Sequence, residues 1–225
     1  MPPAVVIIGA GIIGGSIAFH LLERDPRLRV VMLEKETEPG TGATSKATGG
    51  VRFQFSTEAN VRLTQLSYRY FTHDREILGC SVDFLRHGYL FVTTDAATLE
   101  QCRRNVELQR GLGVASELLT PSRIQTHLAP LVTTDLVGGT FCADDGSADP
   151  YSLLAGFLAV ARSRGLRVLT GRPVIGIVKA GERVIGVRTP GEEWSAPIMI
   201  DCAGPRADEI GAMAGVDIRS PTDAR

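Results

Sequence analysis

Residues 4–14, AVVIIGAGIIG, decide the fold that this chain is expected to adopt. Residues 4–8 form a short apolar run rich in β-branched side chains, which predicts a buried strand. The glycines that follow match the pattern G-x-G-x-x-G. Beyond them Ile13, Ile17 and Leu21 recur at helical spacing and are expected to share one face of a helix. The sequence therefore predicts a strand, a tight glycine turn and a helix.

Each glycine of this turn has a separate expected role. Gly9 allows the tight turn, Gly11 lets the backbone approach a pyrophosphate, and Gly14 brings the helix close to the strand. The first N–H groups of the helix also favour an anion. With Ala10, Ile12 and Ile13 between them, the glycines form one expected phosphate-binding segment.

A second apolar run, residues 29–33, ends at Glu34, 20 residues after Gly14. An acid at this distance accepts hydrogen bonds from the ribose hydroxyls of a dinucleotide, and its charge disfavours a 2′-phosphate. The agreement of strand, turn, helix and acid predicts a bound dinucleotide. The alternative is an ordinary βαβ turn that holds no ligand.

Composition sets outer limits on function. The chain has 225 residues, 44% hydrophobic content and a formal net charge of −1, which fit a globular protein without a nucleic-acid partner. Its four cysteines, at 80, 102, 142 and 202, lie far apart without histidines at ligand spacing, so we expect free thiols and no metal site. The N-terminus resembles neither a signal peptide nor a membrane span, which predicts a cytoplasmic protein.

The loop after Glu34 is dense in glycine, threonine and serine. Because it follows the second strand, where doubly wound folds bind ligands, we expect it to contact the cofactor. A flexible linker is the alternative. The expected contacts are Lys35, Gly42, Ala43, Thr44, Ser45 and Lys46.

The middle of the chain interrupts this pattern with an expected layer of strands and helices. The Asp144-Asp145 pair within it is interpreted as solvated turn charges. The expected elements are a helix over 56–78 capped by Ser56 or Thr57, two short strands within 82–94, a helix through Leu99 and Val106, a helix from Thr120-Pro121, and a strand over 136–142.

The last third of the chain returns to the opening pattern. Asp149-Pro150 starts a helix, and residues 198–201 form a strand that runs into Ala203-Gly204. Between them we expect a strand over 167–170 and a hairpin that turns at Gly181. This second strand with a glycine at its end predicts a return to the first sheet and an α/β fold.

Taken in order, four segments resemble the FAD-dependent oxidoreductases of the D-amino-acid oxidase superfamily. The branch they resemble most contains sarcosine oxidase, glycine oxidase and dimethylglycine dehydrogenase. The segments are Val5 to Glu34, Gly42 through Ser56, Asp149-Pro150-Tyr151, and Asp201 through Pro205.

The resemblance implies a Rossmann-like FAD-binding domain with an inserted partial α+β substrate domain. Residues 1–80 and 146–225 would form the FAD-binding part, and residues 81–145 the substrate part. The glycine turn and Glu34 would hold the ADP half of FAD, and Gly49, Gly50 and Val51 would approach the isoalloxazine. By matching position, Val174 would bond the adenine through its backbone, and Ala203 and Gly204 would lie beside the pyrophosphate.

The implied reaction is oxidation of the C–N bond of a small amine or amino acid, by hydride transfer to the flavin. Arg52 is the candidate catalytic residue, because its guanidinium suits the flavin or a substrate carboxylate; the alternative is a structural arginine. The loop over 40–50 contains no histidine or cysteine, so covalent flavin attachment is not expected there.

Members of this branch are longer than this chain, and Arg206 stands where the family often has tryptophan. A truncated or split-enzyme half-domain that binds FAD without catalysis is therefore the alternative, with a complementary chain as its partner. An NAD-dependent dehydrogenase is disfavoured by the loop after Glu34 and by the Ala203-Gly204 segment.

Overall fold

The structure is a computed structural model, and it describes residues 2–218. Contacts divide the chain into two compact units. Unit 1 contains residues up to 47, residues 78–80 and residues from 150 onward, and unit 2 contains residues 48–77 and 81–149. The domain boundaries expected from the sequence stay a prediction. They differ from these units in assigning residues 48–77 and 146–149 to the cofactor-binding part, and their last residues, 219–225, lie outside the described residues.

Unit 1 is built on a parallel four-stranded sheet in the order β12-β1-β2-β8. Its elements are β1 (Val5–Ile8), α1 (Ile12–Arg24), β2 (Val30–Leu33), α6 (Pro150–Ser163), β8 (Arg167–Leu169), β9 (Gly176–Ala180), β10 (Arg183–Thr189), β11 (Glu192–Ser195), β12 (Ile198–Asp201), the 3₁₀ turn η1 (Gly204–Arg206) and α7 (Ala207–Ala214).

Strand β1 has a parallel partner on each side, so Val5 lies between Val30 of β2 and Ile198 of β12. Every residue of β1 and β2 is buried, which is typical of parallel strands covered on both faces. The expected return of residues 198–201 to the first sheet is thereby confirmed, as is the α/β class.

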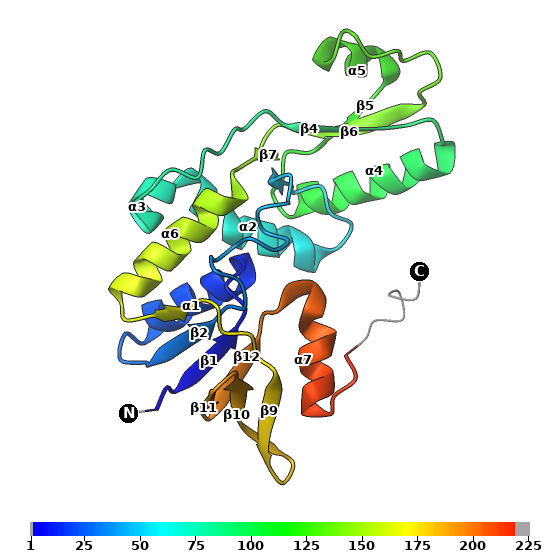
Figure 1. Cartoon of the computed structure of the whole chain (residues 1–225). Helices are drawn as coiled ribbons and strands as arrows, with labels where there is room; N and C mark the ends of the chain where they lie inside the picture. Colours follow the sequence, from blue (N-terminus) through cyan, green and yellow to red (C-terminus); the bar gives the residue numbers. More distant parts are fainter. Residues whose placement is uncertain (1, 219–225) are drawn as a thin grey trace. The chain divides into compact units, whose positions relative to one another are not determined.

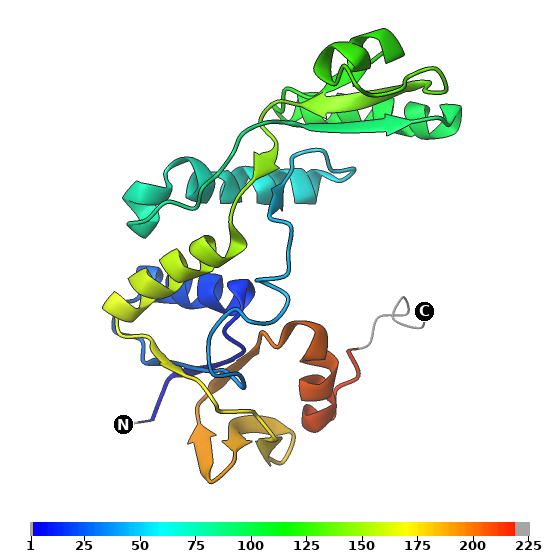
Figure 2. The same cartoon turned by 45° about the horizontal axis from the view of Figure 1, so that its top comes forward.

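The two faces of this sheet have different covers. Val5 and Ile7 pack with α1 and α6 in one apolar cluster, whereas Val6 and Ile8 pack with β9–β11 and α7 in another. Figure 1 shows α1 and α6 side by side along the sheet. In Figure 2 the strands β9–β11 lie on the opposite side of the sheet from these helices. The sheet is therefore the middle layer of unit 1.

The buried face of α1 differs from the one expected. Ile13 is 62% exposed, while Gly14, Ala18 and Leu22 are buried. A β carbon on Gly14 would lie 2.2 Å from the carbonyl oxygen of Gly9. The expectation placed the largest apolar residues inward, but the smallest ones allow the closest approach of this helix to the strand.

Unit 2 contains an antiparallel sheet in the order β4-β6-β5 and a separate two-stranded pair, β3 and β7. Its elements are β3 (Gly50–Val51), α2 (Glu58–Thr72), α3 (Asp74–Leu78, whose last residue belongs to unit 1), β4 (Tyr89–Thr93), α4 (Ala96–Gly111), β5 (Glu117–Leu119), α5 (Pro121–His127), β6 (Gly138–Cys142) and β7 (Gly146–Ser147).

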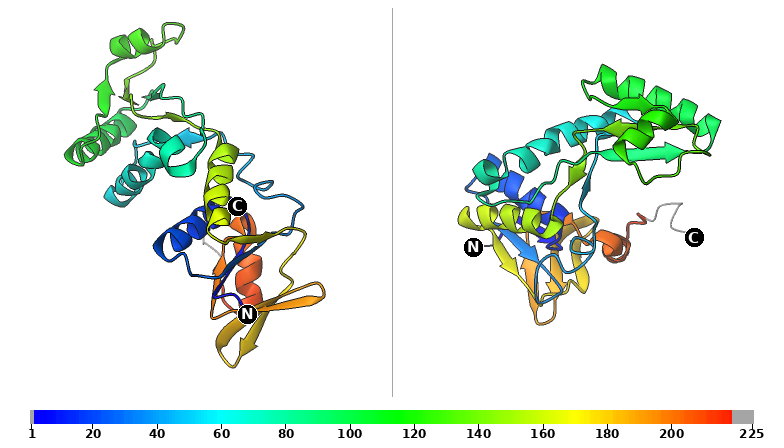
Figure 3. Two further views of the ribbon diagram at one scale, coloured as in Figure 1. Left: turned by 90° about the vertical axis from the view of Figure 1, so that its left-hand side faces the viewer. Right: turned by 90° about the horizontal axis from the view of Figure 1, so that it is seen from above.

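Helices α4 and α5 cover opposite faces of the three-stranded sheet, as two neighbouring glycines of β6 show. A β carbon on Gly138 would point at Leu99 of α4, and one on Gly139 at Ile124 of α5. Figure 3 shows these two helices with the sheet from two further sides. The helix expected from Thr120-Pro121 is confirmed, with Thr120 as its N-cap.

Two expectations for unit 2 were wrong. The helix expected over 56–78 is divided at His73 into α2 and α3, although Thr57 does cap its start. Residues 82–94 contain one strand, β4, because Leu85 forms only an isolated bridge with Ser147. Within residues 2–218, none of the helices combines the length and the apolar character that crossing a membrane requires.

Candidate functional site

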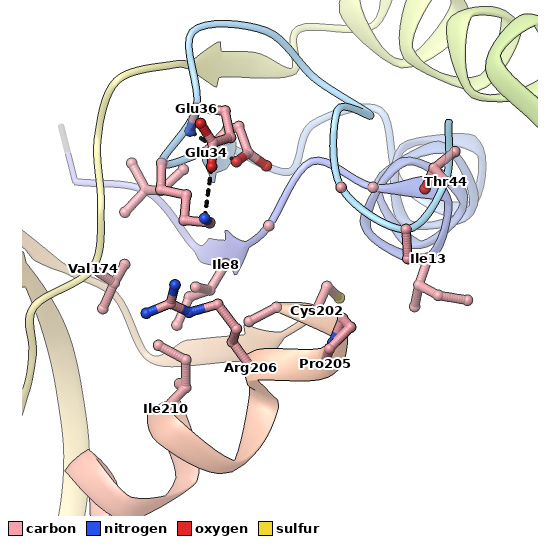
Figure 4. Close-up of a pocket in the computed structure, with 18 of the residues that line it drawn as sticks. Ile8, Ile13, Glu34, Glu36, Thr44, Val174, Cys202, Pro205, Arg206 and Ile210 are labelled. Carbon is pink, nitrogen blue, oxygen red and sulfur yellow. Dashed lines mark hydrogen bonds and ion pairs between the residues drawn. The ribbon is translucent and has the colours of Figure 1, made fainter. Parts of the chain in front are cut away.

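A cavity of about 700 Å³ lies at the carboxyl ends of β1, β2 and β12 in unit 1 (Figure 4). Ile8, Leu33 and Cys202, at or next to these strand ends, line it. Open parallel sheets bind ligands at this edge, and the volume is within the range of cofactor sites. The position and size of the cavity therefore suit a bound cofactor.

The turn between β1 and α1 forms one side of the cavity. Gly9 has φ of +103°, and a β carbon there would lie 2.4 Å from the carbonyl oxygen of Cys202. Gly11 is the N-cap of α1 and lines the cavity together with Ile12 and Ile13. The positive end of the helix dipole therefore faces the cavity, where it favours an anion.

The loop after β2 is tied to this turn. The hydroxyl oxygen of Thr44 accepts a hydrogen bond from the backbone N–H of Ile12 at 3.0 Å. Gly40 donates its backbone N–H to the carbonyl oxygen of Ala10 at 3.1 Å. These bonds hold part of the glycine- and threonine-rich loop against the first turn of α1.

Glu34 is fixed at the end of β2 with both carboxylate oxygens engaged. Oε2 accepts the backbone N–H of Ala10 at 2.8 Å, and Oε1 accepts that of Glu36 at 3.0 Å. Each carboxylate oxygen can accept a further hydrogen bond. Glu34 lines the cavity, so its carboxylate is suited to accept hydrogen bonds from the hydroxyl groups of a ribose.

The facing wall comes from the turn after β12 and from α7. The side chain of Asp201 accepts the backbone N–H of Ala203 at 2.9 Å, which fixes this turn. Burial raises the pKa of the Cys202 thiol to about 11, and the charge of Asp201 adds to the effect. Figure 4 shows Cys202, Pro205 and Ile210 along this wall. The wall is therefore largely apolar and its thiol is protonated at neutral pH.

Arg206 projects from the same wall into the cavity (Figure 4). Its guanidinium donates two hydrogen bonds to one carboxylate oxygen of Glu209, at 2.6 and 3.1 Å. The pKa of Glu36 on the other side is lowered by its hydrogen bond from Lys35 and, to a smaller extent, by Arg206.

The charged side chains around the cavity balance one another. Three are cationic and three anionic, so the side chains supply no excess of positive charge. Attraction for a diphosphate must therefore come mainly from the backbone amides of the α1 turn. The six residues are Lys35, Arg172, Arg206, Glu34, Glu36 and Glu209.

The cavity brings together most residues expected to bind the cofactor. Those that line it are Gly9, Gly11, Ile12, Ile13, Glu34, Lys35, Gly42, Ala43, Thr44, Val174, Ala203 and Gly204. Ala10 instead donates to Glu34 from a buried position, Gly14 serves the helix–strand contact, and Ser45 and Lys46 are exposed in the loop.

Sequence reasoning missed several lining residues that adjoin the expected ones. Gly40 belongs to the glycine-rich loop that was singled out, so composition could have found it. The wall formed by α7 has a weaker signal, because an amphipathic helix there does not reveal which element it faces. The missed residues include Glu36, Gly40, Ala47, Arg172, Pro173, Arg206, Ile210 and Met213.

The expected residues 49–52 belong to unit 2. Gly50 and Val51 form β3 and pair with Ser147 and Gly146 of β7. The guanidinium carbon of Arg52 lies 5.2 Å from the centre of the Tyr89 ring, a cation–π contact. Arg52 therefore lies on an aromatic support in its own unit.

Asp145 is not a solvated turn charge, and that expectation was wrong. Asp145 is completely buried, and its Oδ1 accepts a hydrogen bond from the backbone N–H of Phe53 at 2.7 Å. Oδ2 accepts the side-chain amide of Gln54 at 2.8 Å. Burial raises the pKa of Asp145, and these hydrogen bonds partly oppose the rise. The sequence did not reveal its burial because its partners lie more than 90 positions away.

Comparison with known proteins places these features in a family. A family model described as "DAO: FAD dependent oxidoreductase" matches residues 4–225. Human mitochondrial sarcosine dehydrogenase is 30% identical over 221 residues, which cover 95% of this chain and 24% of that protein.

Two solved structures share the fold. L-proline dehydrogenase from P. horikoshii has a TM-score of 0.88 at 30% identity, covering 98% of this chain and 57% of that one. Glycine oxidase from Geobacillus kaustophilus has a TM-score of 0.80 at 26% identity, covering 95% of this chain and 58% of that one. The chain thus spans about a quarter of the human relative and little more than half of these structures.

Proposed function

The chain belongs to the DAO family of FAD dependent oxidoreductases, and we propose that it binds FAD in unit 1 and serves to oxidise the C–N bond of a small amine or amino acid. The observation that carries this proposal is the cavity at the carboxyl ends of β1, β2 and β12. There the first turn of α1, the Glu34 carboxylate and the Thr44 loop line one space.

The residues of unit 1 fit the ADP half of FAD. The amides at the start of α1 would hold the diphosphate, and Glu34 would accept the ribose hydroxyls. Val174, on the wall near Ile8, would hold the adenine through its backbone. Gly49, Gly50 and Val51 of unit 2 are proposed to approach the isoalloxazine, where the absence of side chains at the two glycines permits close backbone contact.

When bound, FAD supplies the chemistry by accepting a hydride from the carbon beside the amine nitrogen. The contribution of this chain would be to orient the substrate. Arg52 is the proposed anchor for a substrate carboxylate, because a guanidinium supported on an aromatic ring keeps its edge for in-plane hydrogen bonds.

Titration of the purified chain with FAD, followed by flavin absorbance, tests the cofactor site. We expect binding in the wild type and a loss of about tenfold or more in affinity for Glu34→Ala, which removes a buried hydrogen-bonded carboxylate. Glu23→Ala, an exposed change on α1, is the matched control. Absence of any flavin binding in the wild type would overturn the proposal.

A second candidate is that the chain binds FAD but turns over substrate only with a complementary chain. The share of the relatives that it spans favours this reading. Sarcosine, L-proline and glycine, tested with an artificial electron acceptor, separate the two candidates. Reduction of bound flavin supports the first, and stable oxidised flavin with all three amines supports the second. Tight NADH binding without FAD binding would instead favour an NAD-dependent enzyme.

A further inference from the structure

Unit 2 contains a buried carboxylate, Asp145, that the proposed function leaves without a role. Burying a charge is costly unless hydrogen bonds compensate for lost water. The two oxygens of Asp145 meet two donors from consecutive residues, the backbone of Phe53 and the side chain of Gln54. Both residues directly follow Arg52 in the chain. The carboxylate therefore fixes the segment that carries the proposed substrate anchor.

The same network also reaches the aromatic support of Arg52. The side-chain amide of Gln54 donates to the carbonyl oxygen of Tyr89 at 2.9 Å as well as to Asp145. The carbonyl oxygen of Asp145 accepts the backbone N–H of Gly88 at 2.8 Å. One residue thus links the segment after Arg52 to the start of β4, where Tyr89 lies.

Arg52 is held from its other side by the same turn. Gly50 and Val51 pair with β7, which begins one residue after Asp145. The backbone N–H of Ala148 also donates to the carbonyl oxygen of Gly49 at 3.0 Å. The backbone on both sides of Arg52 is therefore fastened to residues 145–148, and the guanidinium lies on the Tyr89 ring.

We propose that Asp145 is a positioning residue, which holds residues 50–54 so that the Arg52 guanidinium rests on Tyr89 and presents its N–H groups to a substrate carboxylate. This inference rests on the proposed role of Arg52. Asp145 does not touch the substrate; it acts through Arg52. Asparagine has the same size but only one acceptor oxygen. In Asp145→Asn the new amide N–H groups would therefore face the N–H groups of the Gln54 amide, and a hydrogen bond would be lost.

The test compares Asp145→Asn with Asp144→Asn in the full chain loaded with FAD. Asp144 gives a matched control because it undergoes the same change at the next position, where its side chain forms an ion pair with Arg86 and is 33% exposed. Acetate is the probe for a carboxylate, with methylammonium as the probe that lacks one. Binding is followed by the shift in flavin absorbance.

We expect Asp145→Asn to weaken acetate binding about tenfold, which corresponds to about 1.4 kcal/mol, because the change breaks a buried hydrogen-bond network. Asp144→Asn should change it by less than about twofold, as surface ion pairs contribute little. The affinity for FAD should stay within about twofold in both variants, because the expected ADP contacts lie in unit 1. Equal acetate affinity in the two variants would overturn the proposal.

A double-mutant cycle separates positioning from a general loss of structure. Arg52→Gln should weaken acetate binding by itself, and adding Asp145→Asn to it should change binding by less than about twofold. Losses that simply add would overturn the positioning role. In the chain without FAD, the rate of backbone amide hydrogen exchange over residues 50–54 should rise in Asp145→Asn and stay unchanged in Asp144→Asn.

Two further outcomes keep this inference distinct from the proposed function. Failure of the wild type to bind FAD would count against the proposed function itself. If FAD binds normally but Arg52→Gln does not change the affinity for acetate, the positioning proposal is overturned while the proposed flavin site stands. If Asp145→Asn fails to fold, Gln54→Leu removes the two hydrogen bonds that the Gln54 amide donates to Asp145 and Tyr89 and should weaken acetate binding about threefold; no weakening would overturn the proposal.

Discussion

The glycines of the β1–α1 turn and Gly50 of β3 are required for different reasons. In unit 1, a β carbon on Gly9 or Gly14 would lie 2.4 or 2.2 Å from a backbone carbonyl oxygen. In unit 2, a β carbon on Gly50 would lie 2.8 Å from the hydroxyl oxygen of Tyr89, a side-chain atom. The conformation of the β1–α1 turn is thus set by contacts of the main chain itself, whereas the segment before Arg52 depends on the side chain of one neighbour, Tyr89.

The largest effect is expected where backbone meets backbone. Gly14→Ala should cost more than about 3 kcal/mol in the free energy of unfolding and abolish FAD binding, because α1 must move away from the turn. Gly42→Ala is the control, since Gly42 lines the cavity and a β carbon there would meet open space, and it should cost less than about 0.5 kcal/mol. Urea unfolding and FAD titration measure both. A Gly14→Ala protein with wild-type affinity would contradict this account of the turn.

A smaller and reversible effect is expected at Gly50. Gly50→Ala should cost about 1–2 kcal/mol, and adding Tyr89→Phe should recover most of it. Without the hydroxyl, the new β carbon would have the ring carbon Cζ at 3.5 Å, an ordinary contact. Urea unfolding of the two single variants and the double variant measures the coupling. If the two changes add without recovery, Gly50 is constrained by something other than Tyr89.

The same contrast explains what the sequence could predict. The β1–α1 turn, Glu34 and the Thr44 loop depend on near-neighbour spacing and on backbone geometry, so a motif reveals them. Ile13 shows the limit, because apolar spacing does not say whether small or large residues face the strand. The α7 wall of the cavity was missed because its partners come from the other end of the chain.

Unit 2 was harder to predict because its contacts depend on side chains far apart in sequence. Asp145 accepts hydrogen bonds from Phe53 and Gln54, which lie more than 90 positions earlier in the sequence, and no local pattern marks Asp145 as buried. The division of the expected helix over 56–78 at His73 likewise lacks a proline or glycine signal. Arg52 was singled out by its position after the glycine pair, but its contact with Tyr89 was not foreseen.

The smallest effect is expected for the reactivity of two cysteine thiols, one in each unit. Burial raises the pKa of Cys202 in unit 1 and of Cys142 in unit 2 to about 11. Because the thiolate is the nucleophile, alkylation of Cys202 by iodoacetamide should quicken about tenfold per pH unit between about pH 8 and 10. Cys142 is completely buried and should stay unmodified while the protein is folded.

Mass spectrometry of alkylated peptides distinguishes these two sites. Cys202 lines the cavity, so FAD should slow its modification, and Cys202→Ser identifies its peptide. Equal reaction of both thiols would show that access does not separate them. A Cys202 rate that is flat from about pH 8 to 10 would contradict the raised pKa.

The pairing of β1 with β12 has a consequence for biosynthesis. It joins Val5 to Ile198, which are 193 residues apart. At about 5–20 residues per second, a ribosome needs roughly 10 to 40 seconds to deliver the second strand after the first. During that interval β1 can pair with β2 but not yet with β12, while the residues of unit 2 are being synthesised. The cavity at the carboxyl ends of β1, β2 and β12 can therefore form only after residue 201 has been synthesised, and a chaperone that binds apolar segments would be expected to bind β1 in the meantime.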